Sequence, residues 1–158
     1  PIQILTVLPH DALAIQQARG LFEEYWTSFG FTPCFQNFGA ELESLPGRFQ
    51  APTGELVLAR DSDSGEPIGV IAYHRWDDTR CEAKRLYVKP LRVDAASGCC
   101  CCMRWPLAPE LPDTVRSSAD TMPAMQDALT LYARMGFEQT APYSDNPTAG
   151  AIYLRYRL

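Results

Sequence analysis

Three short runs rich in apolar residues follow one another in the middle of the chain, with turn residues between them. The runs are Glu55–Arg60 (ELVLAR), Ile68–Trp76 (IGVIAYHRW) and Arg80–Val88 (RCEAKRLYV). Asp61–Pro67 (DSDSGEP) and Asp77–Thr79 (DDT) separate them, and these residue types favour turns. The pattern predicts three strands in an antiparallel meander, which constrains the fold more than any other feature of the sequence.

A strand and two helices are predicted before the meander. Ile2–Leu8 (IQILTVL) is typical of a strand, and Asp11 is a suitable N-terminal cap for the helix that follows it. The apolar face of this helix recurs at steps of three and four residues: Ile15, Ala18, Phe22, Tyr25, Trp26 and Phe29. Gly30 is a suitable helix stop. Phe35–Leu45 predicts a shorter second helix.

One helix and two strands are predicted near the C-terminal end of the sequence. The apolar face of the helix is formed by Met125, Ala128, Leu129, Tyr132 and Met135. Pro123 suits its first turn, and Gly136 followed by Phe137 predicts a Schellman stop. Glu138–Tyr143 and Ala151–Leu158 are the closing strands. This order of elements indicates a mixed α/β or α+β fold.

Length and charge narrow the class of protein. The chain has 158 residues, which fits a single domain over residues 1–158. Its net charge is −5 and it has no basic run, so we expect neither a nucleic acid nor an anionic membrane as partner. It also has no apolar stretch of membrane-spanning length and no signal-peptide pattern, and we therefore expect a cytoplasmic location.

The cysteines do not form a recognisable metal or disulfide pattern. Four of the six are consecutive, Cys99–Cys102, and the others are Cys34 and Cys81. Zinc sites pair elements such as C-x2-C, and adjacent cysteines do not readily all ligate one ion, so we predict no metal site. Cys34 and Cys81 are interpreted as small buried apolar residues. A cysteine-cluster metal or redox protein is the weakest alternative.

Several segments together resemble the GNAT superfamily of acetyl-CoA-dependent N-acetyltransferases. They are Glu66–Gly69 (EPIG) entering a strand, Cys81–Pro90 (CEAKRLYVKP), Ala128–Phe137 (ALTLYARMGF) and Pro142–Pro147 (PYSDNP) followed by Gly150–Tyr153. Pro142–Pro147 followed by Gly150–Tyr153 resembles one bacterial branch of that superfamily. The resemblance implies a mixed, mostly antiparallel sheet of six or seven strands, splayed in the middle and flanked by helices.

The resemblance also implies where acetyl-CoA and its chemistry belong. The pantetheine arm enters the splay and pairs with the strand that carries Leu86, Tyr87 and Val88. A backbone N–H of that strand would stabilise the oxyanion, and the departing thiolate needs an acid. Tyr132 stands where the family places its tyrosine acid. The alternative is that Tyr132 is a core residue of an amphipathic helix.

Glu82 is the candidate base, or the residue that positions the acceptor amine. It lies mid-strand in an apolar context, where the pKa of a carboxyl group can rise toward catalytically useful values. The alternative is a solvated or ion-paired glutamate, with Lys84 or Arg85 as partner. His74 could face the same site, although a histidine on an alternating strand is more often structural or exposed.

The acceptor is expected to be a small-molecule or peptide amine. Its pocket would be lined by the first two helices and by the loop around Tyr143–Asn146, with Tyr25, Phe29, Tyr143 and Asn146 as contact residues. An aromatic run suggests an apolar or aromatic pocket, but most of its members are interpreted as core: Tyr25, Trp26, Phe29, Phe31, Phe35 and Phe38. Homodimers are common in the family, but the sequence does not decide the question for this chain.

The segment after Pro90 departs from the family pattern. The family has Q/R-x-x-G-x-G/A there, and its backbone N–H groups hold the pyrophosphate at a helix N-terminus. The corresponding residues here are Arg92, Val93, Asp94, Ala95, Ala96, Ser97 and Gly98. Asp94 would repel phosphate, and Pro106, Pro109 and Pro112 argue against the helix that should follow, because each interior proline costs about 3 kcal/mol.

The genetic code offers an explanation. If the DNA is read one base earlier, each step between two cysteines becomes TTG or CTG, which both encode leucine. A consistent codon choice converts the segment to RGRGIGLLLLHALAARA, a family-like loop followed by an apolar helix. We therefore hypothesise that Val93 to about Ala119 is an out-of-frame reading between two compensating single-base changes. Either the physical protein carries the intact loop, or the shift is real and the cofactor site is damaged; a natural divergent insert is the remaining alternative.

Two functions follow from these observations. The first is acetyl transfer from acetyl-CoA to a primary amine by direct attack in a ternary complex. The second is a catalytically impaired GNAT-like module that binds or senses a ligand, because the residues at 92–98 do not form a working pyrophosphate loop.

Overall fold

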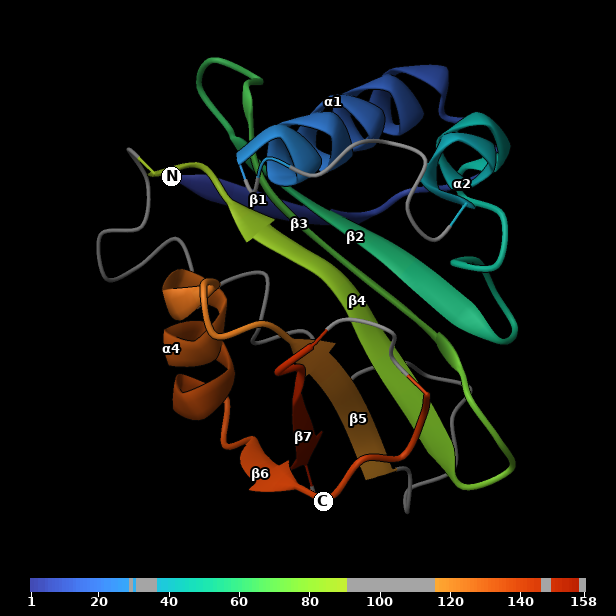
Figure 1. Ribbon diagram of the computed structural model, residues 1–158. Coiled ribbons are helices and arrows are strands. Elements are labelled where there is room, and N and C mark those ends of the chain that lie inside the picture. The colour runs from blue at the N-terminus through green and yellow to red at the C-terminus, as the bar shows by residue number, and fades with distance from the viewer. Residues whose placement is uncertain (29, 31–36, 91–115, 146–148, 157–158) are drawn as a thin grey trace.

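The computed structural model describes residues 1–28, 30, 37–90, 116–145 and 149–156. Its centre is a seven-stranded sheet in the order β1-β2-β3-β4-β5-β7-β6 (Figure 1). The strands are β1 Ile2–Thr6, β2 Gly54–Asp61, β3 Pro67–Arg75, β4 Arg80–Val88, β5 Arg116–Thr121, β6 Glu138–Thr140 and β7 Ile152–Tyr156. The helices are α1 Ala12–Ser28, α2 Phe38–Ser44 and α4 Gln126–Arg134. Every neighbouring pair is antiparallel except β4 and β5, which confirms the mixed, mostly antiparallel sheet.

The predicted meander is present, and its last strand contains an irregularity. Strands β2, β3 and β4 pair in sequence order, and the predicted β4 bounds are correct. The β3–β4 register shifts between Val70 and Ala72, opposite Arg85 and Leu86. Arg85 has φ of 60°, which is rare for a residue with a side chain. Strand β4 therefore bulges at Arg85, and side chains on either side of the bulge are aimed differently.

Strands β4 and β5 pair only where they begin. Their parallel ladder joins Arg80–Ala83 to Arg116–Ala119 and ends there. Strand β4 continues to Val88, and β5 continues to Thr121 beside β7. The two strands separate beyond the ladder, and Figure 1 shows the divergence. We call this opening, between Lys84–Val88 and Asp120–Thr121, the splay.

Local sequence signals explain the helix ends. The Asp11 carboxylate accepts a hydrogen bond from the N–H of Ala14 over 2.9 Å and caps α1 as predicted. At the end of α4, the N–H of Phe137 bonds to the carbonyl of Tyr132 and that of Gly136 bonds to Ala133, both over 3.0 Å. Gly136 has φ of 89°, so the predicted Schellman stop is confirmed. Pro123 was expected inside the first turn, but α4 begins at Gln126, after a turn that contains it.

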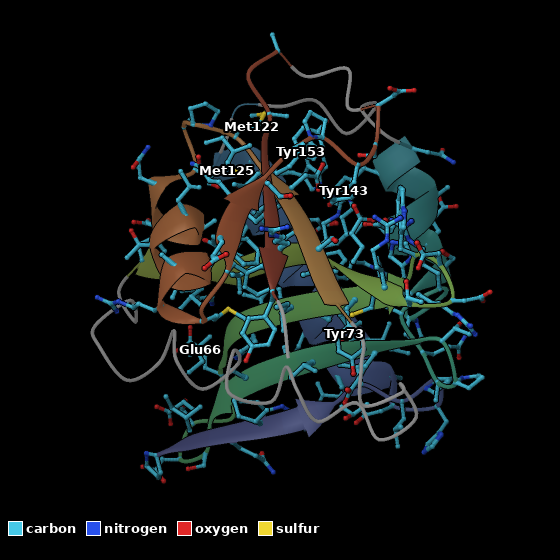
Figure 2. All side chains as sticks on the ribbon, turned by 90° about the horizontal axis from the view of Figure 1, so that it is seen from below. Glu66, Tyr73, Met122, Met125, Tyr143 and Tyr153 are labelled. Carbon is cyan, nitrogen blue, oxygen red and sulfur yellow. The ribbon has the colours of Figure 1, made fainter. Side chains whose placement is uncertain are left out.

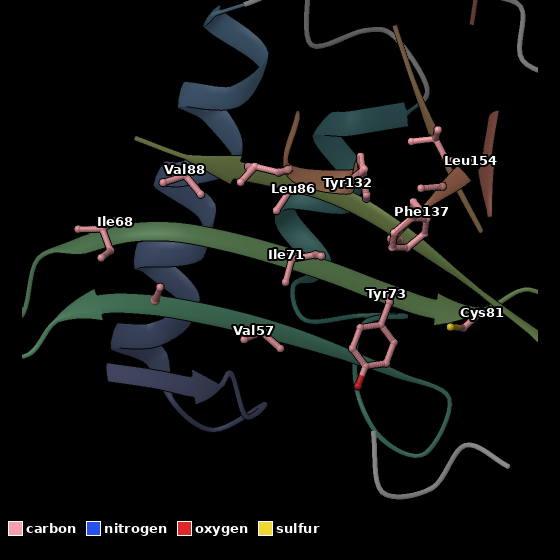
Figure 3. Packing of buried hydrophobic residues seen from close by; sticks show 14 residues of the cluster. Val57, Ile68, Ile71, Tyr73, Cys81, Leu86, Val88, Tyr132, Phe137 and Leu154 are labelled. Atoms are coloured by element: carbon pink, nitrogen blue, oxygen red, sulfur yellow. The ribbon is translucent and has the colours of Figure 1, made fainter. Parts of the chain in front are cut away.

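The described residues form two apolar core clusters, one on each face of the sheet. Helices α1 and α2 cover one face, where Phe22, Trp26 and Phe38 are buried against β2 and β3. Helix α4 covers the other face, where Tyr132 and Phe137 pack against β4 (Figure 3). Alternation along each strand decides which face a side chain joins. Cys81 is buried in the α4 cluster, as expected for a small apolar residue.

Some boundaries differ from the prediction. Strand β5 was not predicted from the residues that form it, because Arg116–Thr121 (RSSADT) has no run of β-branched or aromatic side chains. Its backbone is satisfied by neighbours on both sides, β4 and β7, which overrides the weak local preference. Strand β6 ends at Thr140 instead of Tyr143. The altered-frame hypothesis and the pyrophosphate loop concern residues that lie almost entirely outside the described ones.

Candidate active site

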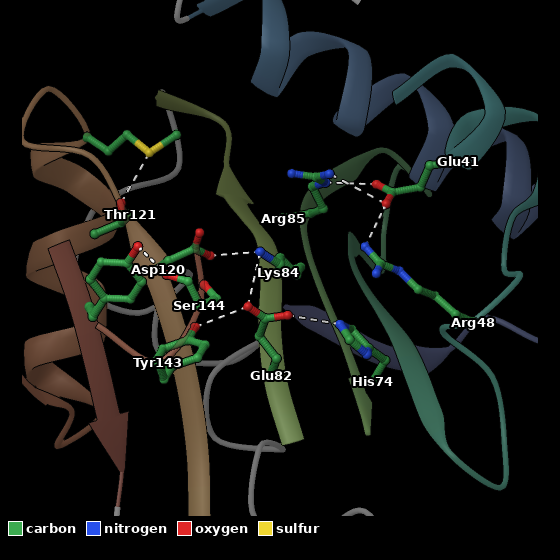
Figure 4. Close-up of polar contacts among 12 residues, drawn as sticks. Glu41, Arg48, His74, Glu82, Lys84, Arg85, Asp120, Thr121, Tyr143 and Ser144 are labelled. Carbon is green, nitrogen blue, oxygen red and sulfur yellow. Dashed lines mark hydrogen bonds and ion pairs between the residues drawn. The ribbon is translucent and has the colours of Figure 1, made fainter. Parts of the chain in front are cut away.

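A buried carboxylate lies at the point where β4 and β5 separate. Glu82 on β4 is 1% exposed, and its two oxygens receive three contacts (Figure 4). The Oε2 atom lies 3.0 Å from Nε2 of His74, and Oε1 accepts a hydrogen bond from the Tyr143 hydroxyl over 3.0 Å. The Lys84 ammonium lies 3.1 Å from the same Oε1. These contacts bring together β3, β4 and the β6–β7 connection around one charge.

The pKa of Glu82 corrects the expectation from the sequence. Burial alone would raise the pKa of this carboxyl group, and that was the basis of the prediction. The hydrogen bond from His74 and the charge and hydrogen bond of Lys84 outweigh burial, so the pKa lies below its ordinary value of 4.5. Glu82 therefore carries a negative charge in the native protein. Glu82 is ion-paired with Lys84, which was one of the alternatives from the sequence. It is buried rather than solvated. Arg85, the other partner considered, pairs with Glu41 instead.

His74 contacts Glu82 directly, although a histidine on an alternating strand is more often structural or exposed. Its Nδ1 is 2.9 Å from the carbonyl oxygen of Arg75, and its Nε2 faces Glu82. Both neighbouring atoms are acceptors, so both contacts are hydrogen bonds only when the ring carries both protons. The sequence signal for this role was the alternation of β3, which puts His74 directly opposite Glu82 in the ladder.

Tyr143, predicted as an acceptor contact, reaches the site from the β6–β7 connection. Burial and the neighbouring Glu82 charge raise the pKa of its hydroxyl far above the ordinary value. The hydroxyl therefore stays protonated and donates to Glu82. The Tyr143 ring packs edge-on against Tyr153 at 5.3 Å and against Trp76 at 5.6 Å, and Figure 2 shows Tyr143 and Tyr153 close together. Trp76 is partly exposed, so this aromatic group forms a rim beside the buried carboxylate.

A second ion pair crosses the start of the splay. Lys84 on β4 lies 2.8 Å from Oδ1 of Asp120 on β5. Its ammonium therefore joins Glu82 to Asp120, and both carboxylates are largely buried. This pair links β4 to β5 immediately after their ladder ends.

Tyr132 lies on the opposite face of the sheet from Glu82. It is 3% exposed, belongs to the α4 cluster, and its ring packs against Phe137 with centroids 5.0 Å apart. Cys81 and Ala83 on β4 face the same cluster, whereas Glu82 between them faces the other side. Any substrate that contacts both Tyr132 and Glu82 must therefore pass through the splay.

The other predicted residues divide into two groups. Leu86, Tyr87 and Val88 form the part of β4 that borders the splay. Tyr25 on α1 lies with its ring 6.2 Å from that of Tyr87, and burial raises its pKa to about 12. Its hydroxyl contacts Sδ of Met125 over 3.8 Å. Phe29, Asn146 and Arg92–Gly98 lie outside the described residues.

A charged group that the sequence did not indicate lies beside the bulge. The Glu41 carboxylate on α2 accepts hydrogen bonds from Nε of Arg85 over 2.8 Å and from Nη2 of Arg48 over 3.0 Å. The Arg85 guanidinium also lies over the Trp26 ring, 5.1 Å from its centroid. These contacts hold the side chain of Arg85, the residue with φ of 60°. No local pattern could have indicated it, since the three charges come from α2, the segment before β2, and β4.

Comparison with known proteins identifies the family. The chain is 30% identical over 152 residues to an uncharacterized N-acetyltransferase of Schizosaccharomyces pombe, and the match covers 96% of this chain and 91% of that protein. The chain belongs to the GNAT superfamily of N-acetyltransferases. No family model matches it.

Solved GNAT structures share the fold. An acetyltransferase of the GNAT family from Staphylococcus aureus matches with a TM-score of 0.79 at 13% identity, over 99% of both chains. Campylobacter jejuni N-acetyltransferase PseH in complex with acetyl coenzyme A matches with a TM-score of 0.60 at 18% identity, also over 99% of both chains. These likenesses confirm the GNAT fold that the sequence motifs predicted.

The described part of the chain was also compared with the requirements of a metal site and of a membrane-spanning helix. Its His, Cys, Asp and Glu side chains do not gather in any group of three or more that could hold a metal ion. None of its helices is both long and apolar enough to cross a membrane.

Proposed function

We propose that the protein transfers an acetyl group from acetyl-CoA to a primary amine by direct attack in a ternary complex. The observation that carries this proposal is the buried, ionised Glu82 at the point where β4 and β5 separate. A thioester lying in the splay would be within reach of groups on both faces of the sheet. The C. jejuni complex with acetyl coenzyme A supports the choice of co-substrate.

Glu82 positions the acceptor amine. A carboxylate offers about four acceptor positions, and three described side chains contact Glu82, so we infer that a further position on Oε2 receives the amine. Its lowered pKa makes Glu82 a weak proton acceptor. Orientation and electrostatic attraction of the amine are therefore its main contributions, and the proton leaves the amine through water.

The edge of β4 holds the acyl donor. The ladder with β5 ends at Ala83, so the backbone of Leu86–Val88 borders the splay and suits pairing with the pantetheine arm. A backbone N–H there stabilises the oxyanion as the N–C bond forms. The C–S bond then breaks, and Tyr132 on the other face supplies the proton that the departing thiolate takes up. Tyr25, beside Tyr87, contributes to the acceptor side.

Two measurements test this function. Acetyl-CoA at 100 times its dissociation constant should stabilise the protein by about 2.7 kcal/mol, which a thermal shift detects. Release of free CoA thiol in the presence of primary amines should depend on the amine. If millimolar acetyl-CoA gives no thermal shift and no thiol appears, the acetyl-transfer proposal is wrong and the impaired GNAT-like module is favoured.

A further inference from the structure

Two arginines share one carboxylate beside the site, so these three described side chains together have a surplus positive charge. Arg85 bonds to Oε1 of Glu41 through Nε and is only 6% exposed. Arg48 bonds to Oε2 of Glu41 through Nη2 over 3.0 Å and is 49% exposed. The group of Glu41, Arg48 and Arg85 therefore carries a net charge of about +1 at neutral pH. The surplus charge is accessible at Arg48, because Arg85 is enclosed by Glu41 and the Trp26 ring.

Arg48 and Glu82 serve the same face of the sheet. Alternation along β4 puts Cys81 and Ala83 in the α4 cluster and turns Glu82 toward the α1–α2 face, where Glu41 lies. A chain of contacts joins the two sites. The Arg48 guanidinium lies 4.9 Å from the Phe49 centroid, the Phe49 ring lies 6.1 Å from that of His74, and His74 contacts Glu82. The contacts place Arg48 and Glu82 on the same face of the sheet, with the Phe49 and His74 rings between them.

A cavity beside Arg48 is large enough for part of a small ligand. It has a volume of about 330 Å³ and lies between α2 and the segment Pro46–Phe49, with Glu41 and Arg48 in its lining. Ligand pockets are typically about 300–1,000 Å³ in volume, so this one suits a small group. Arginine is well suited to a carboxylate there, since its planar guanidinium matches carboxylate geometry in two parallel hydrogen bonds.

The backbone holds Arg48 in place. A Cβ on Gly54 would lie 2.7 Å from the carbonyl oxygen of Tyr73 and even closer to that of Arg48. Only glycine lets the Arg48–Phe49 segment pack this closely against the start of β2. The guanidinium is thus presented from a fixed support.

We propose that Arg48 binds a carboxylate of the acceptor, so that the acceptor is an amino acid or short peptide with its carboxylate several bonds from the reacting amine. This inference rests on the proposed acetyl transfer, in which Glu82 positions the amine. A carboxylate at Arg48 and an ammonium at Glu82 would fix the two ends of one elongated molecule. Charge complementarity at both ends then selects against simple alkylamines.

Calorimetric titration tests the inference without any need for turnover. The ligands are a homologous series of ω-amino acids and the n-alkylamines of matched length, which differ only in the carboxylate. The wild-type protein should bind the best ω-amino acid about tenfold to a hundredfold more tightly than its matched alkylamine, as expected for a charge-assisted hydrogen bond. Arg48→Met should abolish this preference, Arg48→Lys should retain part of it, and Arg134→Met on the exposed end of α4 should leave it unchanged.

The outcomes separate this inference from the proposed function. Equal or absent binding of the two ligand series by the wild-type protein, or an unchanged preference in Arg48→Met, overturns the role of Arg48. If thiol release then still occurs with alkylamines, acetyl transfer stands and only the acceptor class is wrong. If the carboxylate preference is present and depends on Arg48 while no amine releases thiol, the binding site stands and the transfer proposal fails. Circular dichroism of each variant confirms that it is folded.

Discussion

The hydroxyl of Tyr143 donates a hydrogen bond to Oε1 of Glu82 over 3.0 Å, between residues 61 positions apart in the sequence. This bond attaches the β6–β7 connection to the middle of β4. Tyr143→Phe should therefore lower stability by about 1 kcal/mol and reduce kcat/KM for acetyl transfer, because a buried carboxylate loses a donor that stays protonated.

Urea unfolding and the rate of thiol release measure these two effects. Tyr153→Phe is the matched control, because its hydroxyl donates to the carbonyl oxygen of Ser144 over 2.9 Å. An equal loss of activity in both variants would contradict a specific role for the bond between Tyr143 and Glu82.

His74 should set the pKa of Glu82. The hydrogen bond from His74 is the strongest influence that lowers this pKa, whereas burial raises it. In His74→Phe we expect the Glu82 pKa to rise and the acidic limb of the kcat/KM profile to move to higher pH. The pH profile of His10→Phe should match that of the wild type, since His10 lies in the exposed turn before α1. An unmoved acidic limb in His74→Phe would show that Glu82 does not control that limb.

The stability of the protein should depend on the ionisation of Glu82. Its native pKa is lower than the ordinary 4.5, so the carboxylate contributes stability that is present above pH 4.5 and is lost as pH falls through the native pKa. Glu82→Gln does not titrate there. In urea unfolding, the free energy of unfolding of the wild type should exceed that of Glu82→Gln by about 1–3 kcal/mol at neutral pH. The difference should be smaller at acidic pH. A difference that is constant with pH would contradict the ionised carboxylate.

At position 85 the glycine variant should be more stable than the alanine variant, which is the reverse of the usual order in strands. In most strands glycine is about 0.5–1 kcal/mol less stable than alanine, because it loses more backbone freedom on folding. Arg85 has φ of 60°, where a Cβ is strained. Arg85→Gly should therefore be more stable than Arg85→Ala in urea unfolding, although both lose the ion pair with Glu41. At Arg80 on the same strand, which has no positive φ, the ordinary order should hold.

The segment after Pro90 leads to a prediction about the protein's mass. If the physical protein carries the intact loop, protein expressed from the natural gene should yield a leucine-rich peptide where this sequence has Cys99–Cys102. Intact mass and peptide mapping measure this directly. A mass equal to that of this sequence, 17.6 kDa, would reject the version with an intact loop. A real shift should then appear as weak or absent stabilisation by acetyl-CoA.

The meander, both long helices and the GNAT family could be predicted from the sequence, because their signals are local. Turn residues such as Asp77 and Gly136 lie beside strongly patterned segments, so the predicted bounds of β4 and the predicted stop of α4 are correct. Glu82 could be singled out as a carboxylate in an apolar strand. Strand β5 could not, because its pairing with β4 and β7 decides its conformation and its own residues have little preference.

Only the tertiary structure decided what surrounds Glu82. The direction of its pKa depends on His74 and Lys84, and neither the distance to these groups nor the hydrogen bond of Tyr143 follows from the order of residues. The position of Tyr132 on the opposite face follows from packing of α4 on β4. Local sequence sets the alternation of a strand and the ends of a helix, because these depend on neighbouring residues. Charge interactions depend on distances across the fold, and these are fixed only when the sheet, the bulge at Arg85 and the helices have packed together.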